Sequence, residues 1–118
     1  MKIVYASRTG NVQNFVDKTG LEDTMLIENG KEKVKENFVL ITYTDGYGEL
    51  PEEVATFLEN NNEFLVGVAA SGDTGYGDAF CLAADVVSDT YGVPILAKFE
   101  FDGTDEDVET FVNALSKL

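Results

Sequence analysis

Residues 38–43 read Phe-Val-Leu-Ile-Thr-Tyr, the longest unbroken strand-like run in the first half of the chain. A continuous apolar run with β-branched residues is typical of a strand that is buried on both faces of a parallel sheet. Residues 44–50, which follow directly, read Thr-Asp-Gly-Tyr-Gly-Glu-Leu and form a polar, glycine-rich segment. The stretch therefore predicts a central strand that ends in a loop.

Four further strand-like runs accompany the central one. They cover residues 2–6, 24–28, 64–70 and 93–101. Residues 98–101 alternate charged and aromatic side chains, which indicates a half-exposed strand at an edge of the sheet.

Apolar residues at helical spacing separate most of these runs. The first helix is predicted to begin after Gly10, and the second to have Pro51 in its first turn. Asp78 and Thr104 are predicted to cap the third and fourth helices, and Gly92 to end the third. The apolar faces are Val12, Phe15 and Val16; Val54, Phe57 and Leu58; Leu82, Val86, Val87 and Tyr91; and Val108, Phe111, Val112 and Leu115.

The segment 29–37 is strongly charged and contains one apolar residue, Val34. It predicts a reduced connection or one polar turn in place of a helix. The alternation elsewhere implies an α/β fold, a parallel sheet with helices on both faces, and the chain length suits one domain over residues 1–118. Ligands of such sheets bind beyond the carboxyl ends of the strands, which directs attention to three loops.

The first of these loops, residues 7–12, is Ser-Arg-Thr-Gly-Asn-Val and joins a strand to a helix N-terminus. Backbone N–H groups, hydroxyls and the helix dipole make such a loop suitable for a phosphate. An ordinary helix cap is the alternative. The loop lacks the Gly-Lys-Ser/Thr ending of a nucleoside-triphosphate site and the three glycines of a dinucleotide site.

The other two loops, residues 44–50 and 71–80, place tyrosines between closely spaced glycines. Glycine lets the backbone approach a flat ligand, and tyrosine offers a stacking face. One such loop alone would be interpreted as a surface turn. Three loops at carboxyl strand ends favour a planar ligand that carries a phosphate.

Charge and composition exclude several classes of function. The chain has 22 acidic and 8 basic residues, a net charge of −14 and no histidine. Neither nucleic acid nor a membrane surface is expected as a partner, because both need clustered Lys and Arg. No metal site and no catalytic residue of the chain's own is predicted. The single cysteine, Cys81, fits a reducing, cytoplasmic location, and the N-terminus has no features of a signal peptide.

Four stretches carry a resemblance to a known family: SRTGNVQNF (7–15), ITYTDGYGELP (41–51), ASGDTGYGD (70–78) and VPILAKF (93–99). They resemble the NrdI family, flavodoxin-like activators of class Ib ribonucleotide reductase. The resemblance implies a three-layer sandwich with a five-stranded parallel sheet of order 2-1-3-4-5. It also implies bound FMN and a redox accessory protein rather than a stand-alone enzyme.

By the same resemblance, the reduced flavin reacts with oxygen and supplies a superoxide-like oxidant to the dimanganese subunit of the reductase, after a separate reductant has reduced the flavin. Residues 7–12 would hold the FMN phosphate, 44–48 the isoalloxazine near its N5, and 71–80 its other side, with Tyr76 as the stacking ring. The implied cofactor-binding residues are Ser7, Arg8, Thr9, Gly10, Asn11, Val12, Tyr43, Thr44, Asp45, Gly46, Tyr47, Gly48, Ser71, Gly72, Asp73, Tyr76, Gly77 and Phe80.

Some alternatives stay open. Arg8 is either a ligand contact or a solvent-exposed side chain, and Cys81 is expected just inside a helix, buried and inert. The short chain, the reduced connection and Val12 favour the NrdI family over electron-carrier flavodoxins. Acidic residues in the flavin loops favour a one-electron carrier: Asp45, Glu49, Asp73 and Asp78. A phosphoacceptor receiver domain would need an acidic pair where this chain has Ser7 and Arg8.

Overall fold

The strand β3 (Phe38–Tyr43) lies at the centre of the sheet, as its apolar sequence predicts. The computed structural model describes residues 1–118, and in it five parallel strands follow the predicted order β2-β1-β3-β4-β5. The other strands are β1 (Lys2–Tyr5), β2 (Thr24–Leu26), β4 (Leu65–Gly72) and β5 (Ile95–Glu100). The sheet edges are therefore β2 and β5, the latter as predicted.

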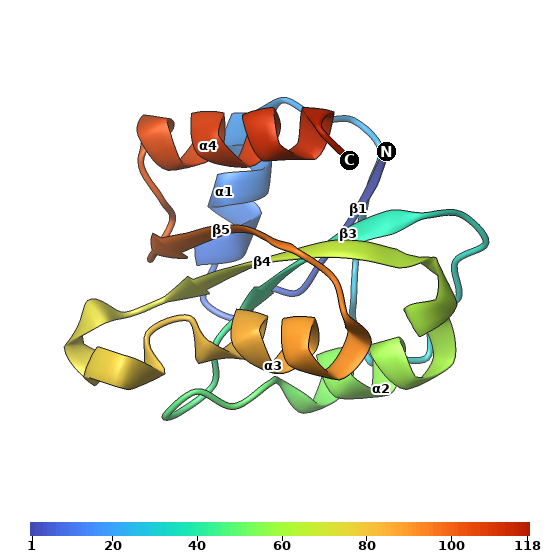
Figure 1. Ribbon diagram of the computed structural model, residues 1–118, viewed down its shortest axis with the longest axis horizontal. Coiled ribbons are helices and arrows are strands. Elements are labelled where there is room, and N and C mark those ends of the chain that lie inside the picture. The colour runs from blue at the N-terminus through green and yellow to red at the C-terminus, as the bar shows by residue number, and fades with distance from the viewer.

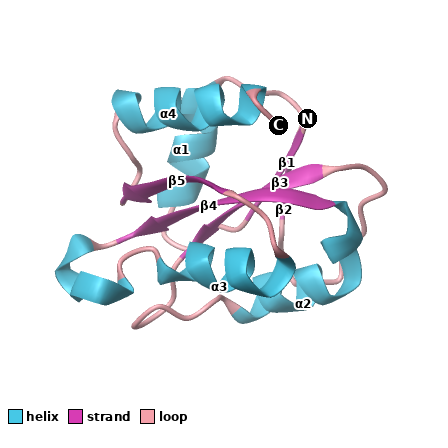
Figure 2. Ribbon diagram, viewed as in Figure 1, coloured by secondary structure: helices cyan, strands magenta, loops and turns pink.

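Helices cover both faces of the sheet, which confirms the three-layer prediction (Figure 1). On one face lie α1 (Asn11–Thr19) and α4 (Asp105–Ser116), and on the other α2 (Glu52–Asn61) and α3 (Leu82–Tyr91) (Figure 2). Two short 3₁₀ segments, η1 (Asn62–Phe64) and η2 (Thr74–Ala79), flank β4. Each face has its own apolar core; on the α1/α4 face Phe15 stacks on Phe99 at 3.8 Å. None of these helices is long and apolar enough to cross a membrane.

The connection between β2 and β3 contains no helix, as the sequence predicts. The buried side chain of Asn61, at the end of α2, holds it in place. The Asn61 amide oxygen accepts the Val34 N–H at 3.0 Å, and its Nδ2 donates to the carbonyls of Glu32 and Phe57, both at 2.9 Å. The hydrogen bonds of this one buried amide thus fasten the connection to α2, and the buried Val34 side chain packs into the core beside it.

A carboxylate completes this connection. The Glu32 side chain accepts backbone N–H groups from residues 28–30, and these bonds lower the pKa of Glu32 although burial opposes them. A Cβ at Gly30 would lie 2.5 Å from the Glu53 carbonyl, so only glycine lets the chain run this close to α2.

Two predictions about α3 are wrong. Asp78 does not cap the helix, because it lies in η2, and α3 begins only after Cys81, which adopts a left-handed φ of 52°. Val86 is exposed, since α3 turns its small residues toward the sheet; its buried residues are Ala83, Ala84 and Val87. The delay in helix onset comes from a kink at Gly77, which separates two 3₁₀ turns.

The remaining helix ends follow the sequence closely. Pro51 stands one position before α2 rather than within its first turn. Gly92 ends α3 in a left-handed conformation, as predicted. Thr104 caps α4, and its hydroxyl and the Asp107 carboxylate accept each other's backbone N–H groups.

Both chain termini lie at the amino edge of the sheet, where the strands begin (Figure 1). Lys2 pairs with Phe38 at the start of β1 and β3. Leu118 lies beside Gly67 near the start of β4, where a Cβ on that glycine would be 3.6 Å from it. The carboxyl ends of the strands thus face away from both termini.

Candidate functional site

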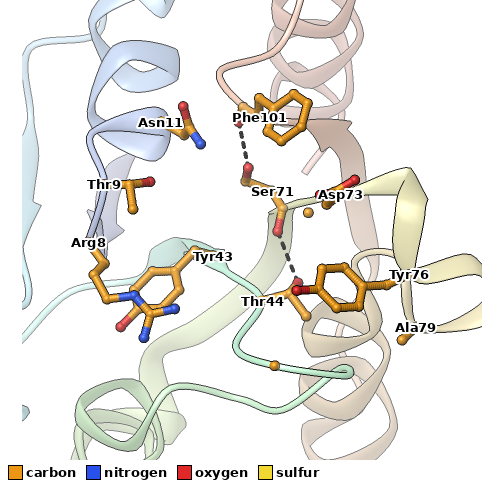
Figure 3. A pocket seen from close by; sticks show the side chains of 12 residues that line it. Arg8, Thr9, Asn11, Tyr43, Thr44, Ser71, Asp73, Tyr76, Ala79 and Phe101 are labelled. Carbon is orange, nitrogen blue, oxygen red and sulfur yellow. Dashed lines mark hydrogen bonds between the residues drawn. The ribbon is translucent and has the colours of Figure 1, made fainter.

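A cavity of about 260 Å³ opens at the carboxyl ends of β1, β3 and β4, where the sequence predicts a ligand (Figure 3). This volume is close to the lower end of the range for small-molecule sites, about 300–1,000 Å³. The residues that line it come from all three predicted loops and from the end of β5: Arg8, Thr9, Asn11, Tyr43, Thr44, Gly46, Ser71, Gly72, Asp73, Tyr76, Ala79 and Phe101.

The first loop brings a helix N-terminus to the cavity. Gly10 has a left-handed φ of 95° and no side chain to cap α1, which starts at the next residue; of the N–H groups in the first turn, that of Gln13 is bonded to Ser7, and those of Asn11 and Val12 have no side-chain partner. The first N–H groups of a helix have no partner within the helix, so they are available to an anion. Thr9 and Asn11 line the cavity beside them (Figure 3).

Ser7 and Val12 belong to the same loop but do not line the cavity. The Ser7 hydroxyl accepts the Gln13 N–H at 3.2 Å, so it ties the loop to the first turn of α1. Val12 is buried in the core between α1 and the sheet. Only the backbone of Val12 is therefore suited to contact a ligand.

Arg8 crosses from the first loop to the second. Its Nη2 donates to Asp45 Oδ1 at 3.1 Å, and its guanidinium lies 4.8 Å from the centre of the Tyr43 ring. The Tyr43 hydroxyl donates to Glu53 at 2.7 Å; burial and this carboxylate raise the pKa of Tyr43 to about 12. Tyr43 thus stays neutral and provides a fixed platform under the cation.

The second loop is a tight turn closed by its own backbone. The N–H and carbonyl of Asp45 bond to Glu49 at 2.8 and 2.7 Å. The Thr44 hydroxyl donates to the Ser71 carbonyl at 2.9 Å, which joins this loop to the third. Gly48 packs against Leu82, where a Cβ would come within 2.6 Å of that side chain. Gly48 therefore supports the turn and does not line the cavity.

The third loop packs closely against Cys81 at Gly72 and is hydrogen-bonded to β5 through Thr74. A Cβ on Gly72 would lie 2.8 Å from the Cys81 nitrogen, so glycine is required there. The Asp73 carboxylate accepts the Gly75 N–H at 2.8 Å. Thr74 donates its N–H and hydroxyl to Glu100, and these bonds lower the pKa of that carboxyl. The loop is thereby fixed to β5.

The two tyrosines of the glycine-rich loops meet outside the sheet. Tyr76 lines the cavity and is 45% exposed, whereas Tyr47 is 79% exposed and does not line it. Their rings form an edge-to-face pair at 5.1 Å. Phe80 packs against the core, and Gly77 only bends the chain. This placement favours Tyr76 as the stacking residue.

Two lining residues are absent from the predicted set of cofactor-binding residues: Ala79, which lies inside the predicted third loop, and Phe101, which lies outside all three loops. Phe101 was predicted to continue the last strand, but it has a left-handed φ of 53° and is half exposed. Its N–H donates to the Gly72 carbonyl at 3.0 Å and its carbonyl accepts the Ser71 hydroxyl at 2.5 Å. The Asp102-Gly103 pair that follows is a turn signal and indicates an earlier strand end.

Cys81 lies beneath this loop. Its thiol is buried and donates to the carbonyls of Ala70 and Phe99 at 3.3 and 3.4 Å. Burial raises its pKa to about 12, so the thiol is held in its unreactive form, as expected. Its position differs from the prediction, since it precedes α3 rather than lying inside it.

The predicted site residues therefore fall into two groups. Those brought together around the cavity are Arg8, Thr9, Asn11, Tyr43, Thr44, Gly46, Ser71, Gly72, Asp73 and Tyr76. Those in the same loops but not lining it are Ser7, Gly10, Val12, Asp45, Tyr47, Gly48, Gly77 and Phe80. The cavity wall combines neutral hydroxyl and amide donors with one cation, Arg8, and with two exposed aromatic rings, Tyr76 and Phe101. This combination fits a flat ligand with an anionic group.

Known proteins resemble this chain over nearly its whole length. The family described as "NrdI Flavodoxin like" matches residues 3–113. The protein NrdI of Bacillus licheniformis is 48% identical over 118 residues, which is all of this chain and 89% of that relative.

Solved flavodoxins share the fold. The TIGR4 flavodoxin of Streptococcus pneumoniae is 28% identical, with a TM-score of 0.70, and the alignment covers 99% of this chain and 98% of that one. A short-chain flavodoxin associated with a non-canonical PDU bacterial microcompartment is 25% identical, with a TM-score of 0.69 and coverage of 98% and 95%. Flavodoxin 2 from Bacillus cereus is 25% identical, with a TM-score of 0.66 over the full length of both chains.

Proposed function

Since the chain belongs to the NrdI flavodoxin-like family, which implies a flavin and a redox role, we propose that it binds one FMN in the cavity between its three loops. The observation that carries this proposal is the convergence of these loops at the carboxyl edge of a single sheet. Residues 1–118 would then form one FMN-binding domain.

The donors around the cavity suit the parts of FMN. The N–H groups at the start of α1, with the side chains of Thr9 and Asn11, would hold the phosphate. The backbone of residues 44–48 would lie along the isoalloxazine, and Tyr76 would stack on it. Phe101, on the loop after β5, would border the ring. When bound, FMN supplies the redox chemistry.

The protein would act as a redox activator of class Ib ribonucleotide reductase in the cytoplasm. It would take electrons from a cellular reductant, react with oxygen while docked on the dimanganese subunit, and deliver a superoxide-like oxidant to it. Family membership supports this role. The absence of histidine from the sequence also agrees with chemistry that resides in the cofactor.

The surface charge supports a protein partner. A net charge of −14 favours association with a complementary, positively charged patch and makes that association sensitive to salt. Tyr76 is exposed on the cavity wall and Tyr47 is exposed beside it, so a partner docked over the cavity would cover both rings. Exposed aromatic residues are common anchors in protein interfaces.

A one-electron carrier is the second candidate. Similarity to solved flavodoxins supports it, as do the acidic residues of the second and third loops. Asp73 lines the cavity, Asp45 contacts the lining residue Arg8, and Glu49 and Asp78 lie in the same two loops. Carboxylates near a flavin disfavour additional negative charge on it. Measured reduction potentials would distinguish the two roles only together with an assay on the partner.

The test begins with purification and a visible spectrum, for which we expect flavin absorbance and one FMN per chain. The reduced protein is then mixed with the manganese-loaded reductase subunit and oxygen, and the tyrosyl radical is measured by electron paramagnetic resonance. The control omits the flavoprotein. No radical, together with efficient electron transfer to an unrelated acceptor, would favour the carrier; no bound flavin would reject both roles.

A further inference from the structure

Arg8 is the only arginine in the chain and the only cationic residue that lines the cavity. Its guanidinium lies over the ring of Tyr43, which the Glu53 carboxylate fixes from the other side. In Figure 3 the guanidinium and this ring lie against each other at the end of the cavity next to the first loop. The cation thus belongs to the same loop whose N–H groups have the features of an anion site.

The ion pair between Arg8 and Asp45 is weak. One nitrogen, Nη2, contacts Asp45 Oδ1 at 3.1 Å, and the two side chains are 57% and 39% exposed. Ion pairs this open to water add little net stability. A guanidinium has five donors in a planar fork that matches two phosphate oxygens, and a single carboxylate contact leaves most of them free.

Because the protein is strongly acidic, the positive charge of Arg8 matters more for binding an anionic ligand. Its net charge of −14 repels a dianionic ligand at long range, and Asp73 adds a negative charge to the cavity wall. A phosphate carries up to twice the charge of a carboxylate and binds Arg in the bidentate manner. A phosphate in the cavity therefore competes favourably with Asp45 for the guanidinium.

We propose that Arg8 selects phosphorylated over unphosphorylated flavin, and that Asp45 is the competing anion that holds Arg8 until the ligand phosphate replaces it. This inference rests on the proposed FMN function. The exchange breaks one ion pair and forms another, with no covalent change. Asp45 thus weakens FMN binding, and its removal strengthens it.

The test compares FMN with riboflavin, which lacks the phosphate, by fluorescence titration of the flavin-free protein. Arg8→Gln should weaken FMN binding about tenfold and leave riboflavin binding nearly unchanged. Arg8→Lys, which keeps the charge without the fork, should lie between the parent and Arg8→Gln. Asp45→Asn should tighten FMN binding about threefold, because it releases Arg8.

The matched control is Glu49→Gln, which removes the same unit of charge from the same loop at a residue that does not contact Arg8. Asp45→Asn keeps the turn, since the backbone of Asp45 makes the bonds to Gly48 and Glu49. If Arg8→Gln weakens both flavins equally, or Asp45→Asn behaves like Glu49→Gln, the inference is wrong although FMN binding stands. A parent protein that binds neither flavin would reject the proposed function as well.

Discussion

Single glycines and aromatic residues set the geometry of the cavity. Gly10 at the start of α1 needs a left-handed conformation, and Gly72 needs space that the Cys81 backbone would deny to any side chain. Tyr76 lies on the cavity wall, and its neighbour Tyr47 does not. These residue-scale differences allow matched tests in which one position serves as the control for another.

Gly10→Val is expected to weaken FMN binding by at least about tenfold. A β-branched residue in the left-handed region costs about 1–3 kcal/mol, so the loop would relax away from the conformation that presents its N–H groups. Gly20→Val is the control, because Gly20 ends the same helix with φ 71° and equally open surroundings. FMN titration checks the pair; similar affinities for the two variants would contradict the assignment of the phosphate loop.

Tyr76→Ala is expected to weaken FMN binding more than Tyr47→Ala. Stacking of an aromatic side chain on a nucleic-acid base, a close analogue of a flavin, contributes about 1–3 kcal/mol. Tyr47 is 79% exposed, does not line the cavity and forms an edge-to-face pair with Tyr76, so its loss should have a smaller effect. Binding titrations and the fluorescence of bound flavin measure the difference. Weak and equal effects of the two substitutions would mean that both tyrosines only belong to turns and do not contact the flavin.

At the scale of elements, the reduced connection between β2 and β3 depends on a buried side chain. Asn61 satisfies the Val34 N–H and joins the Glu32 carbonyl to α2. Because this network lies near the amino edge of the sheet, it supports the fold without entering the cavity.

Asn61→Ala is expected to lower the free energy of unfolding by about 1–3 kcal/mol, since it leaves a buried N–H group without a partner. Asn62→Ala is the control, because the Asn62 amide donates only to carbonyls of the adjacent helix. Urea unfolding measures both variants, and FMN affinity should stay at the parental value in each. Equal destabilisation would mean that the connection does not depend on Asn61.

The elements show how far the sequence determines this structure. Local patterns predicted the central strand, the edge strand, the missing helix and most residues of the cavity. The predictions failed where Cys81 and Phe101 adopt left-handed conformations. Such conformations are uncommon outside glycine, and here tertiary hydrogen bonds accompany them: the Cys81 thiol to the sheet, and the Phe101 backbone to β4. No local pattern encodes those partners.

At the scale of the whole molecule, the net charge of −14 opposes the approach of any anion, although the cavity wall carries one cation. Long-range repulsion acts on the rate of encounter, whereas contacts within the cavity act on the lifetime of the complex. The two effects therefore separate in kinetic measurements.

The association rate constant of FMN is expected to rise with ionic strength, because salt screens the repulsion between the protein and a dianion. The association rate of riboflavin, which is neutral, should change little. Stopped-flow quenching of flavin fluorescence at several salt concentrations measures both. An FMN rate that falls with salt would show that the local attraction of Arg8 outweighs the overall charge.

Both termini lie at the amino edge of the sheet, and the cavity opens at the carboxyl edge (Figure 1). A linker attached to either end would therefore orient the molecule with its cavity turned away from the support. Immobilisation on an electrode through either terminus should leave the edge of a bound flavin open to dissolved oxygen and to a docking protein. The flavin would then lie on the side of the molecule that faces away from the electrode surface. In such a film, oxygen and a docking protein could reach the cavity from the solution, whereas direct electron transfer between the electrode and the cavity would be slow. The two routes could then be measured separately.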